Sequence, residues 1–251
     1  MLSKNEMLEI VQAQLAIEFT CEPSDFMQNE NIISTSQLHE KRRKFTDKLS
    51  FFKMVTMGGN AIISADEVMH EWLSDYVEDK PGHWLFEFRN LIEIENQLAI
   101  YGKKIRGTSH MFLPFNDYEI KCIDYPVCWY EGDDIHQFYN GMYYTKNAIC
   151  PVYNPNRPDT LVVVALDDNK IIGMAGCSAD TDIMWQIGID VDEKYRGKGI
   201  GAFLVNSLKK EIFSRGKLPY YGTSLSNIHS WKIALSCGFV PVWVETGTIE
   251  D

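Results

Sequence analysis

Apolar residues recur every three or four positions in several stretches of the chain, and this spacing predicts helices. Met7, Val11 and Leu15 follow it in residues 5–18, which predicts a first helix. The other stretches that favour helices are residues 64–77 (capped by Ser64 or Asp66), 86–101, 132–144, 199–213 and 227–237.

Short apolar runs bounded by turn residues predict strands between these helices. Three runs in series are the clearest: Leu161–Leu166, Lys170–Cys177 and Ile183–Val191, with Asp- and Asn-containing turns between them. Further strands are predicted for residues 49–57 and 61–64 (a hairpin or a bent strand around Gly58–Asn60), 109–114, 122–130, 219–223 and 239–244. The chain is therefore of mixed α/β (α+β) class.

A polar stretch from Gln28 to Lys48 interrupts this pattern and contains the basic run Lys41–Lys44. The run is interpreted as the solvated face of a helix, and contact with an anionic ligand is the alternative. We find no internal repeat and no low-complexity tract.

Composition narrows the class of protein. The 251 residues are 45% apolar, which suffices for one large domain or two smaller ones. The formal net charge of −11 argues against a nucleic-acid partner and would suit a cationic substrate such as an amine, although acidity can serve solubility alone. No signal peptide or apolar run of membrane-span length is apparent, and the six cysteines lack metal-ligand spacing. We therefore expect a cytoplasmic protein with free thiols, no metal and no membrane partner.

The chemistry of the chain is most evident in the loop Arg196–Gly201 and the helix predicted after it. Ile200, Leu204, Leu208 and Ile212 form one apolar row, so this helix packs on the sheet and its N-terminus faces the loop. Unpaired N–H groups and the helix dipole make such a terminus a binding site for anions. Gly199 and Gly201 let the backbone approach a phosphate without a Cβ in the way, and Arg196 and Lys198 add positive charge to the loop. The loop therefore predicts a phosphate site.

Two other nucleotide motifs compete for the same residues. Gly197–Ala202 fits the relaxed fingerprint G-x-G-x-x-A of dinucleotide-binding folds. That fold needs an acidic ribose-binding residue about 20 positions later, and no Asp or Glu lies between Glu211 and Glu245. A Walker loop fails because no Gly-Lys-Ser/Thr stands at the required spacing. The sequence therefore argues against a nucleotide-dependent oxidoreductase, the class of enzyme that the dinucleotide-binding fingerprint would suggest.

The run Ile189–Leu204 resembles the signature of the GNAT acetyltransferase superfamily: a strand ending in Val, a polar turn, then Arg/Gln-x-x-Gly-x-Gly/Ala. Asn227–Ser230, followed by Ala234 and Cys237–Phe239, resembles the second motif of the family, an Asn-x-x-Ser/Ala helix that leads to Gly-Phe. The resemblance covers residues 120–251. It implies a mostly antiparallel twisted sheet flanked by helices, preceded here by a smaller N-terminal α/β domain.

The resemblance also implies acetyl-CoA as cosubstrate. The backbone of Ile189 and Val191 would pair with the pantetheine amides, and an amide near Ile189 would polarise the thioester carbonyl. Asn227 and Ser230 would contact the far side of the arm. The residues that would hold the pyrophosphate are Arg196, Gly197, Lys198, Gly199, Ile200, Gly201 and Ala202.

The catalytic residues are harder to predict, because the tyrosine that often acts as general acid in the family is replaced by Ala234. Tyr221, or its neighbour Tyr220, is the candidate substitute. Asp180, with Asp182, is a candidate base acting through water, and Gln186 could orient a water or the substrate. Candidate substrate contacts are Trp185, Glu131 and Asp134, for which core packing and helix capping are the competing interpretations.

These observations predict an N-acetyltransferase acting on a primary amine of a small molecule, over a domain of residues 116–251. A non-catalytic acyl-CoA sensor is the alternative, favoured by the missing tyrosine. For residues 1–115 three roles stay open: a lid that shapes the acceptor pocket, a homodimer interface, or a degenerate copy of the same fold.

Overall fold

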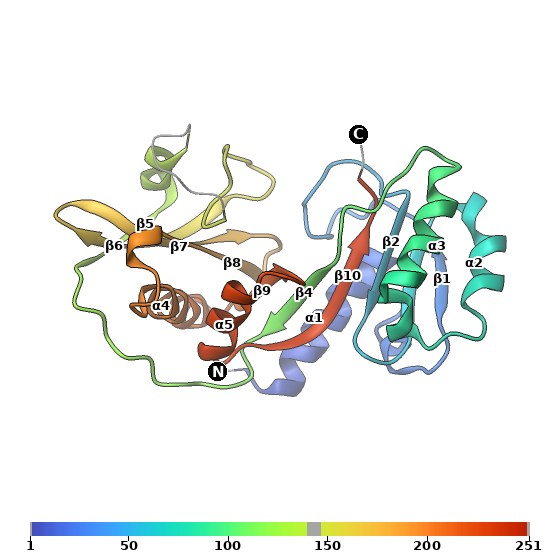
Figure 1. Ribbon diagram of the computed structural model, residues 1–251, viewed down its shortest axis with the longest axis horizontal. Helices are drawn as coiled ribbons and strands as arrows, with labels where there is room; N and C mark the ends of the chain where they lie inside the picture. Colours follow the sequence, from blue (N-terminus) through green and yellow to red (C-terminus); the bar gives the residue numbers. More distant parts are fainter. Residues whose placement is uncertain (1, 140–146, 250–251) are drawn as a thin grey trace. The chain divides into compact units, whose positions relative to one another are not determined.

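The computed structural model describes residues 2–139 and 147–249, and these residues form two compact units (Figure 1). The motif unit comprises residues 112–223 and 227–240, and the N-terminal unit comprises residues 2–111, 224–226 and 241–251. Each unit is described by itself.

The motif unit is built on a sheet of strand order β4-β9-β8-β7-β6-β5. Strands β5 to β8 pair antiparallel, whereas β8 and β9 are parallel. The strands are β4 (Ser109–Leu113), β5 (Val127–Glu131), β6 (Asp159–Asp167), β7 (Lys170–Ala179), β8 (Met184–Val191) and β9 (Leu218–Ser224). The mixed, mostly antiparallel sheet expected from the sequence is confirmed.

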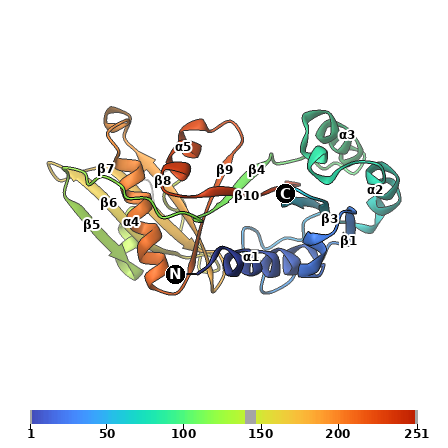
Figure 2. The same ribbon diagram turned by 90° about the horizontal axis from the view of Figure 1, so that it is seen from below.

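Different segments cover the two faces of this sheet (Figures 1 and 2). On one face lies α4 (Ile200–Ser214), whose apolar row is fully buried against side chains such as Val163, Ala175 and Ile187. α5 (Ile228–Ser236) lies beside it and contributes Ala234 to the same core. Alternation along the strands sends Val162, Val164 and Met174 to the other face, where they pack against Ile135, Phe138 and Ile149.

Two glycines let the segment around Ala148 lie directly on that second face. A Cβ at Gly176 would overlap the carbonyl oxygen of Ala148, and one at Gly188 would overlap that of Asn147. Asp190 fastens the same segment, because its carboxylate accepts hydrogen bonds from the backbone N–H groups of Asn147 (2.7 Å) and Ala148 (2.8 Å). The backbone therefore approaches β8 closely, just where β8 continues towards the loop.

The N-terminal unit contains strands that neighbour one another in the order β1-β3-β2-β10. Its strands are β1 (Ile32–Thr35), β2 (Phe52–Thr56), β3 (Ala61–Ala65) and β10 (Val240–Gly247). Its helices are α1 (Lys4–Phe19), α2 (His70–Val77) and α3 (Phe88–Ala99). No helix within the described residues is long and apolar enough to span a bilayer.

The division of the chain differs from the predicted boundary between residues 115 and 116. Residues 241–251 belong to the N-terminal unit, because β10 pairs antiparallel with β2 through Val244–Gly247. Trp243 and Thr246 are buried there. A linear boundary could not anticipate a last strand that returns to the first part of the chain.

The basic run Lys41–Lys44 was interpreted wrongly as a solvated helix face. It lies in a loop, and Arg43 is buried, with hydrogen bonds to the carboxylates of Glu18 and Glu245. The polar stretch also contains β1, which the sequence did not predict.

The predicted helix 132–144 is a 3-10 helix, Gly132–Phe138, over its described part. Ile135 and Phe138, three residues apart, are its buried positions, which suits three residues per turn. Residues 140–144 of that prediction lie outside the described residues.

Candidate active site

The site begins where two parallel strands separate. β8 and β9 are in register from Met184↔Leu218 to Ile187↔Tyr221, and β8 then continues to Val191 while paired only with β7 on its other side. The sheet is therefore open on one side of residues 188–191.

The direction of the backbone groups identifies which residues face this opening. Ile183 accepts a hydrogen bond from Leu218 on the β9 side, whereas the N–H of Asp192 donates to Ile172 on the β7 side. Backbone groups alternate in direction along a strand, so Ile189 and Val191 direct theirs towards the opening. These are the two residues predicted to pair with pantetheine.

The loop after β8 ends in a helix N-terminus without a side-chain cap. The N-cap of α4 is Gly199, with φ +81°, and Gly197 has φ +78°. A Cβ at either glycine would meet no atom within 4 Å. The first N–H groups of α4, from Ile200 onwards, receive no side-chain cap and lie at the positive end of the helix dipole.

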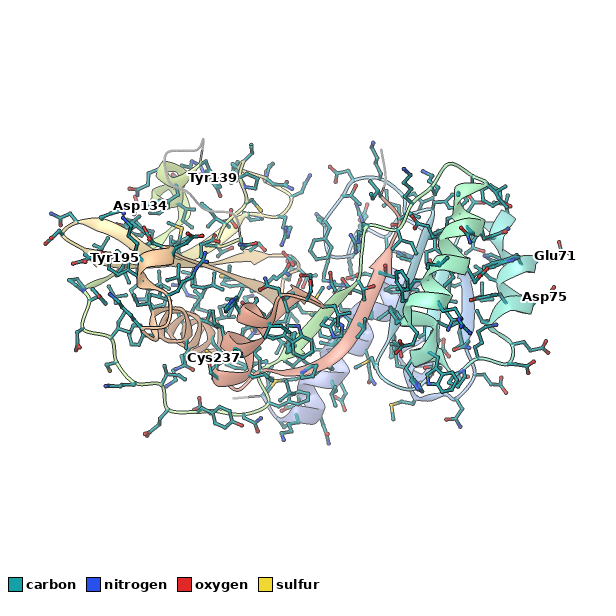
Figure 3. The ribbon with its side chains drawn as sticks, in the orientation of Figure 1. Glu71, Asp75, Asp134, Tyr139, Tyr195 and Cys237 are labelled. Carbon is teal, nitrogen blue, oxygen red and sulfur yellow. The ribbon has the colours of Figure 1, made fainter. Side chains whose placement is uncertain are left out.

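Both cations of the loop are at its surface. The Nε–H of Arg196 donates to the carbonyl of Val191 (3.2 Å), and its guanidinium lies 3.6 Å from Glu193. The Lys198 ammonium lies 4.7 Å from the ring centroid of Tyr195 and 3.4 Å from the Tyr125 hydroxyl. Tyr195 is labelled in Figure 3. Neither cation is committed to a buried partner, so both can turn towards an anion at the helix terminus.

Gly201 and Ala202 have packing roles besides their predicted contact with the pyrophosphate. A Cβ on Gly201 would lie 3.0 Å from Ile233 on α5, so glycine sets the spacing of α4 and α5. The carbonyl of Ala202 accepts a hydrogen bond from the thiol of Cys237 (3.2 Å), which is labelled in Figure 3.

Asn227, Ser230 and Tyr221 lie on the other side of the opening. Asn227 caps α5, since its side-chain oxygen accepts the N–H of Ser230 (3.2 Å). The Ser230 hydroxyl lies 2.7 Å from that of Tyr221, the last residue of β9 in register with β8. Burial raises the pKa of Tyr221 to about 12, so its phenol stays protonated at neutral pH.

Asp180 and Gln186 belong to one polar network on the second face of the sheet. Asp180 accepts hydrogen bonds from the side chains of Arg157, Ser178 and Tyr220. Arg157 also donates to Oε1 of Gln186 (2.8 Å). These bonds occupy both oxygens of Asp180, which is only 2% exposed. The structure therefore argues against its predicted role as a base acting through water.

The predicted substrate residues are not gathered with this network. Trp185 is 7% exposed and packs in the core on the α4 face. Glu131 pairs with Arg215 (2.7 Å) at the end of β5, three strands from β8 and therefore about 14 Å away. Asp134 follows it on the 3-10 helix and is exposed (Figure 3).

Sequence reasoning missed Arg157 and Asp159. Asp159 accepts hydrogen bonds from the Tyr139 hydroxyl (2.9 Å) and the Cys150 N–H (3.0 Å), and burial raises its pKa to about 6. The only signal was their place at the end of the segment 151–158, which contains three prolines and is typical of a loop, and at the first residue of β6. Among the described residues, no group of three or more His, Cys, Asp or Glu side chains is placed to hold a metal ion.

An opened parallel strand pair that leads into a glycine-lined helix terminus provides backbone groups along its length and an anion-binding end. Residues 118–239 match the model of the acetyltransferase (GNAT) family, so the chain contains a GNAT acetyltransferase domain over these residues. The resemblance of the two sequence motifs is thereby confirmed. No curated protein matches the chain significantly.

Several solved structures are similar to the chain. A GNAT-family acetyltransferase from Colwellia psychrerythraea shares 12% identity at TM-score 0.46, covering 100% of this chain and 98% of its own. A GNAT-family structure from Novosphingobium aromaticivorans shares 13% identity at TM-score 0.43, covering 59% of this chain and 66% of its own. A Bacillus anthracis protein in complex with acetyl coenzyme A shares 25% identity at TM-score 0.31, over 37% of this chain and 62% of its own.

Proposed function

We propose that this protein transfers the acetyl group of acetyl-CoA to a primary amine of a small molecule by direct attack on the thioester. The observation that carries the proposal is the continuity of the opening beside Ile189 and Val191 with the uncapped terminus of α4. A ligand with amides along one part and a pyrophosphate at its end matches this surface, and the match of residues 118–239 to the acetyltransferase (GNAT) family supports acetyl-CoA as that ligand.

Three groups of residues bind acetyl-CoA, each at a different part of the molecule. The N–H groups at the start of α4, with Arg196 and Lys198, bind the pyrophosphate. The backbone of Ile189 and Val191 orients the pantetheine arm. The amide near Ile189 donates to the thioester carbonyl, whose oxygen becomes more negative as the amine attacks.

Tyr221 and Ser230 stabilise the leaving thiolate. A phenol with a pKa of about 12 holds its proton more tightly than a thiol of pKa about 8.5. Full transfer of the proton to the thiolate is therefore uphill, and Tyr221 acts by donating a hydrogen bond while water supplies the proton.

Solvent removes the proton of the amine before attack, because the carboxylate of Asp180 is occupied by Arg157, Ser178 and Tyr220. The rate should then rise with pH until the acceptor amine is fully unprotonated.

A non-catalytic acyl-CoA sensor is the second candidate, supported by Ala234 at the tyrosine position and by the occupied Asp180. The two functions are separated by incubating the protein with acetyl-CoA and a panel of primary amines while following thiol release and acetylated products. Turnover with at least one amine is the expected result. Thermal stabilisation by acetyl-CoA without turnover on any amine would favour the sensor. Stabilisation by NAD but not by coenzyme A would contradict both the acetyltransferase and the sensor.

A further inference from the structure

The orientation of one side-chain amide in the polar network restricts what it can bind. Gln186 lies on β8 one residue before Ile187, the last β8 residue in register with β9. At about 3.3 Å per residue, its Cα lies within a few ångström of the point where the strands part. Gln186 is partly exposed, so a ligand can reach it.

Arg157 fixes which end of this amide faces inwards. A guanidinium has only donors, so the atom 2.8 Å from its Nη2 must be the oxygen of Gln186 and not the nitrogen. Tyr220 lies 3.4 Å from the same oxygen. Arg157 is itself held by Asp180, a buried carboxylate that also binds Ser178 and Tyr220. The amide therefore cannot reverse without leaving Arg157 opposite an NH₂ group.

The nitrogen of Gln186 consequently points away from the network with both of its hydrogens. Within residues 2–139 and 147–249 it has no hydrogen-bond partner, and it is not among the side-chain atoms cut off from solvent. A solvent-accessible amide NH₂ beside an acyl-transfer site binds oxygen acceptors such as carbonyls and carboxylates.

We propose that Gln186 selects acceptors whose primary amine has a carboxylate or amide carbonyl on the neighbouring carbon, that is, α-amino acids or their amides. This inference rests on the proposed acetyltransferase function and names its substrate class. The amine nitrogen forms the new N–C bond as the C–S bond of the thioester breaks. The amine loses one proton to solvent, and the thiolate of coenzyme A gains one.

Within this class, the amino-acid amides suit the lack of an available carboxylate base. An amine next to an amide carbonyl has a pKa of about 8, against about 10.4 for a simple alkyl amine. At pH 7 the unprotonated fraction is then larger by a factor on the order of 100. Such an acceptor needs less help from the protein to lose its proton.

The test compares matched acceptors at saturating acetyl-CoA: several amino acids, their amides, and the amines that result from their decarboxylation. Each kcat/KM is expressed per unprotonated amine at the assay pH. For the wild type, this corrected kcat/KM of the acids or amides should exceed that of the decarboxylated amines by about tenfold or more. Preference for acids over amides, or the reverse, distinguishes a carboxylate from a carbonyl as the bound group.

Gln186→Glu is the discriminating variant. Glutamate keeps an oxygen for Arg157 but removes the donor, so the preference should fall to about one or reverse. Gln186→Leu should also lower it, and provides a second reading if the first variant folds poorly. Gln137→Leu, at an exposed glutamine on the 3-10 helix, is the matched control and should keep the wild-type ratio.

Two outcomes overturn the inference alone: a wild type that acetylates amines without this preference, or a Gln186→Glu variant that keeps it. If acetyl-CoA binds but the wild type acetylates no amine of any set, the proposed function fails and takes the inference with it.

Discussion

Replacing Arg43 with methionine should destabilise the N-terminal unit strongly, because it leaves two buried carboxylates without their shared cation. The guanidinium lies 2.8 Å from Glu18 and 2.7 Å from Glu245, and its side chain is 2% exposed. Removing one member of a buried ion pair costs about 3–5 kcal/mol. Since domains are stable by only about 5–15 kcal/mol, the loss should be large in urea denaturation followed by far-UV circular dichroism.

The pH dependence gives this prediction a second readout. Burial alone would raise the pKa of Glu18, but the charge and hydrogen bonds of Arg43 outweigh it and hold the pKa below its usual value. This contribution to stability is present above the unfolded pKa and is lost as the pH falls through the folded one. Without Arg43, burial dominates, and the penalty is relieved on acidification. The difference between wild type and variant should therefore begin to shrink above pH 4.5, as the carboxyl groups of the variant take up protons, and should shrink further below pH 4.5, where the wild type loses its own stabilisation.

Two controls separate the ion cluster from general effects of substitution. Lys41→Met, in the same basic run but exposed, should change stability by no more than about 0.5 kcal/mol. The variant with Glu18→Leu, Arg43→Met and Glu245→Leu should recover most of the loss, because apolar groups can replace a buried ion pair. A loss below about 1 kcal/mol for Arg43→Met, or a difference that grows on acidification, would refute the reasoning.

Three other substitutions test the motif unit. Tyr221→Phe removes the hydroxyl next to Ser230 and should lower kcat by about tenfold in steady-state assays with unchanged acetyl-CoA affinity; an unchanged kcat would contradict its role. Gly188→Ala should cost about 1–3 kcal/mol in thermal or urea unfolding, because its Cβ overlaps Asn147; wild-type stability would show that the close approach is absent. Burial raises the pKa of Asp159 to about 6, so its ionisation weakens folding as the pH rises from about 4 to above 6. Asp159→Asn should therefore gain stability relative to wild type over this range, and a relative loss would count against the assignment.

The elements of the motif unit follow from local pattern. Ile200, Leu204, Leu208 and Ile212 predicted the buried face of α4, and all four are buried. The loop Arg196–Gly201 could also be predicted, because its glycines and the start of α4 lie within a few adjacent residues. Gly197 and Gly199 of this loop have positive φ. Local sequence carries this information because helix periodicity and turn chemistry act over short distances.

Features that depend on distant partners could not be predicted in the same way. Arg43 is buried because its charge is paired with the carboxylates of Glu18 and Glu245. These partners lie 25 and 202 residues away in the sequence, so no local pattern could identify them. β1 forms by parallel pairing with β3, through Ile32↔Ile62 and its neighbours, and its own four residues show no alternation.

The candidate site shows the same limit. Gln186 was identified as a candidate from the sequence, but the direction of its amide depends on Arg157, 29 residues earlier. Asp180 was a candidate base acting through water, whereas tertiary contacts with Arg157 and Tyr220 occupy its carboxylate.

The most direct test of the account is the equilibrium affinity for acetyl-CoA, measured by titration calorimetry on the wild type and on Gly199→Asp. An aspartate there places a side chain and a negative charge at the anion-binding end of α4. The matched control is Gly216→Asp at the other end of the same helix, where the glycine also has positive φ (+71°) and open space around a Cβ. We predict that Gly199→Asp binds acetyl-CoA at least about 100-fold more weakly, which corresponds to about 2.7 kcal/mol, while Gly216→Asp binds like the wild type. Wild-type affinity in a folded Gly199→Asp variant would contradict the assignment of this loop as the pyrophosphate site.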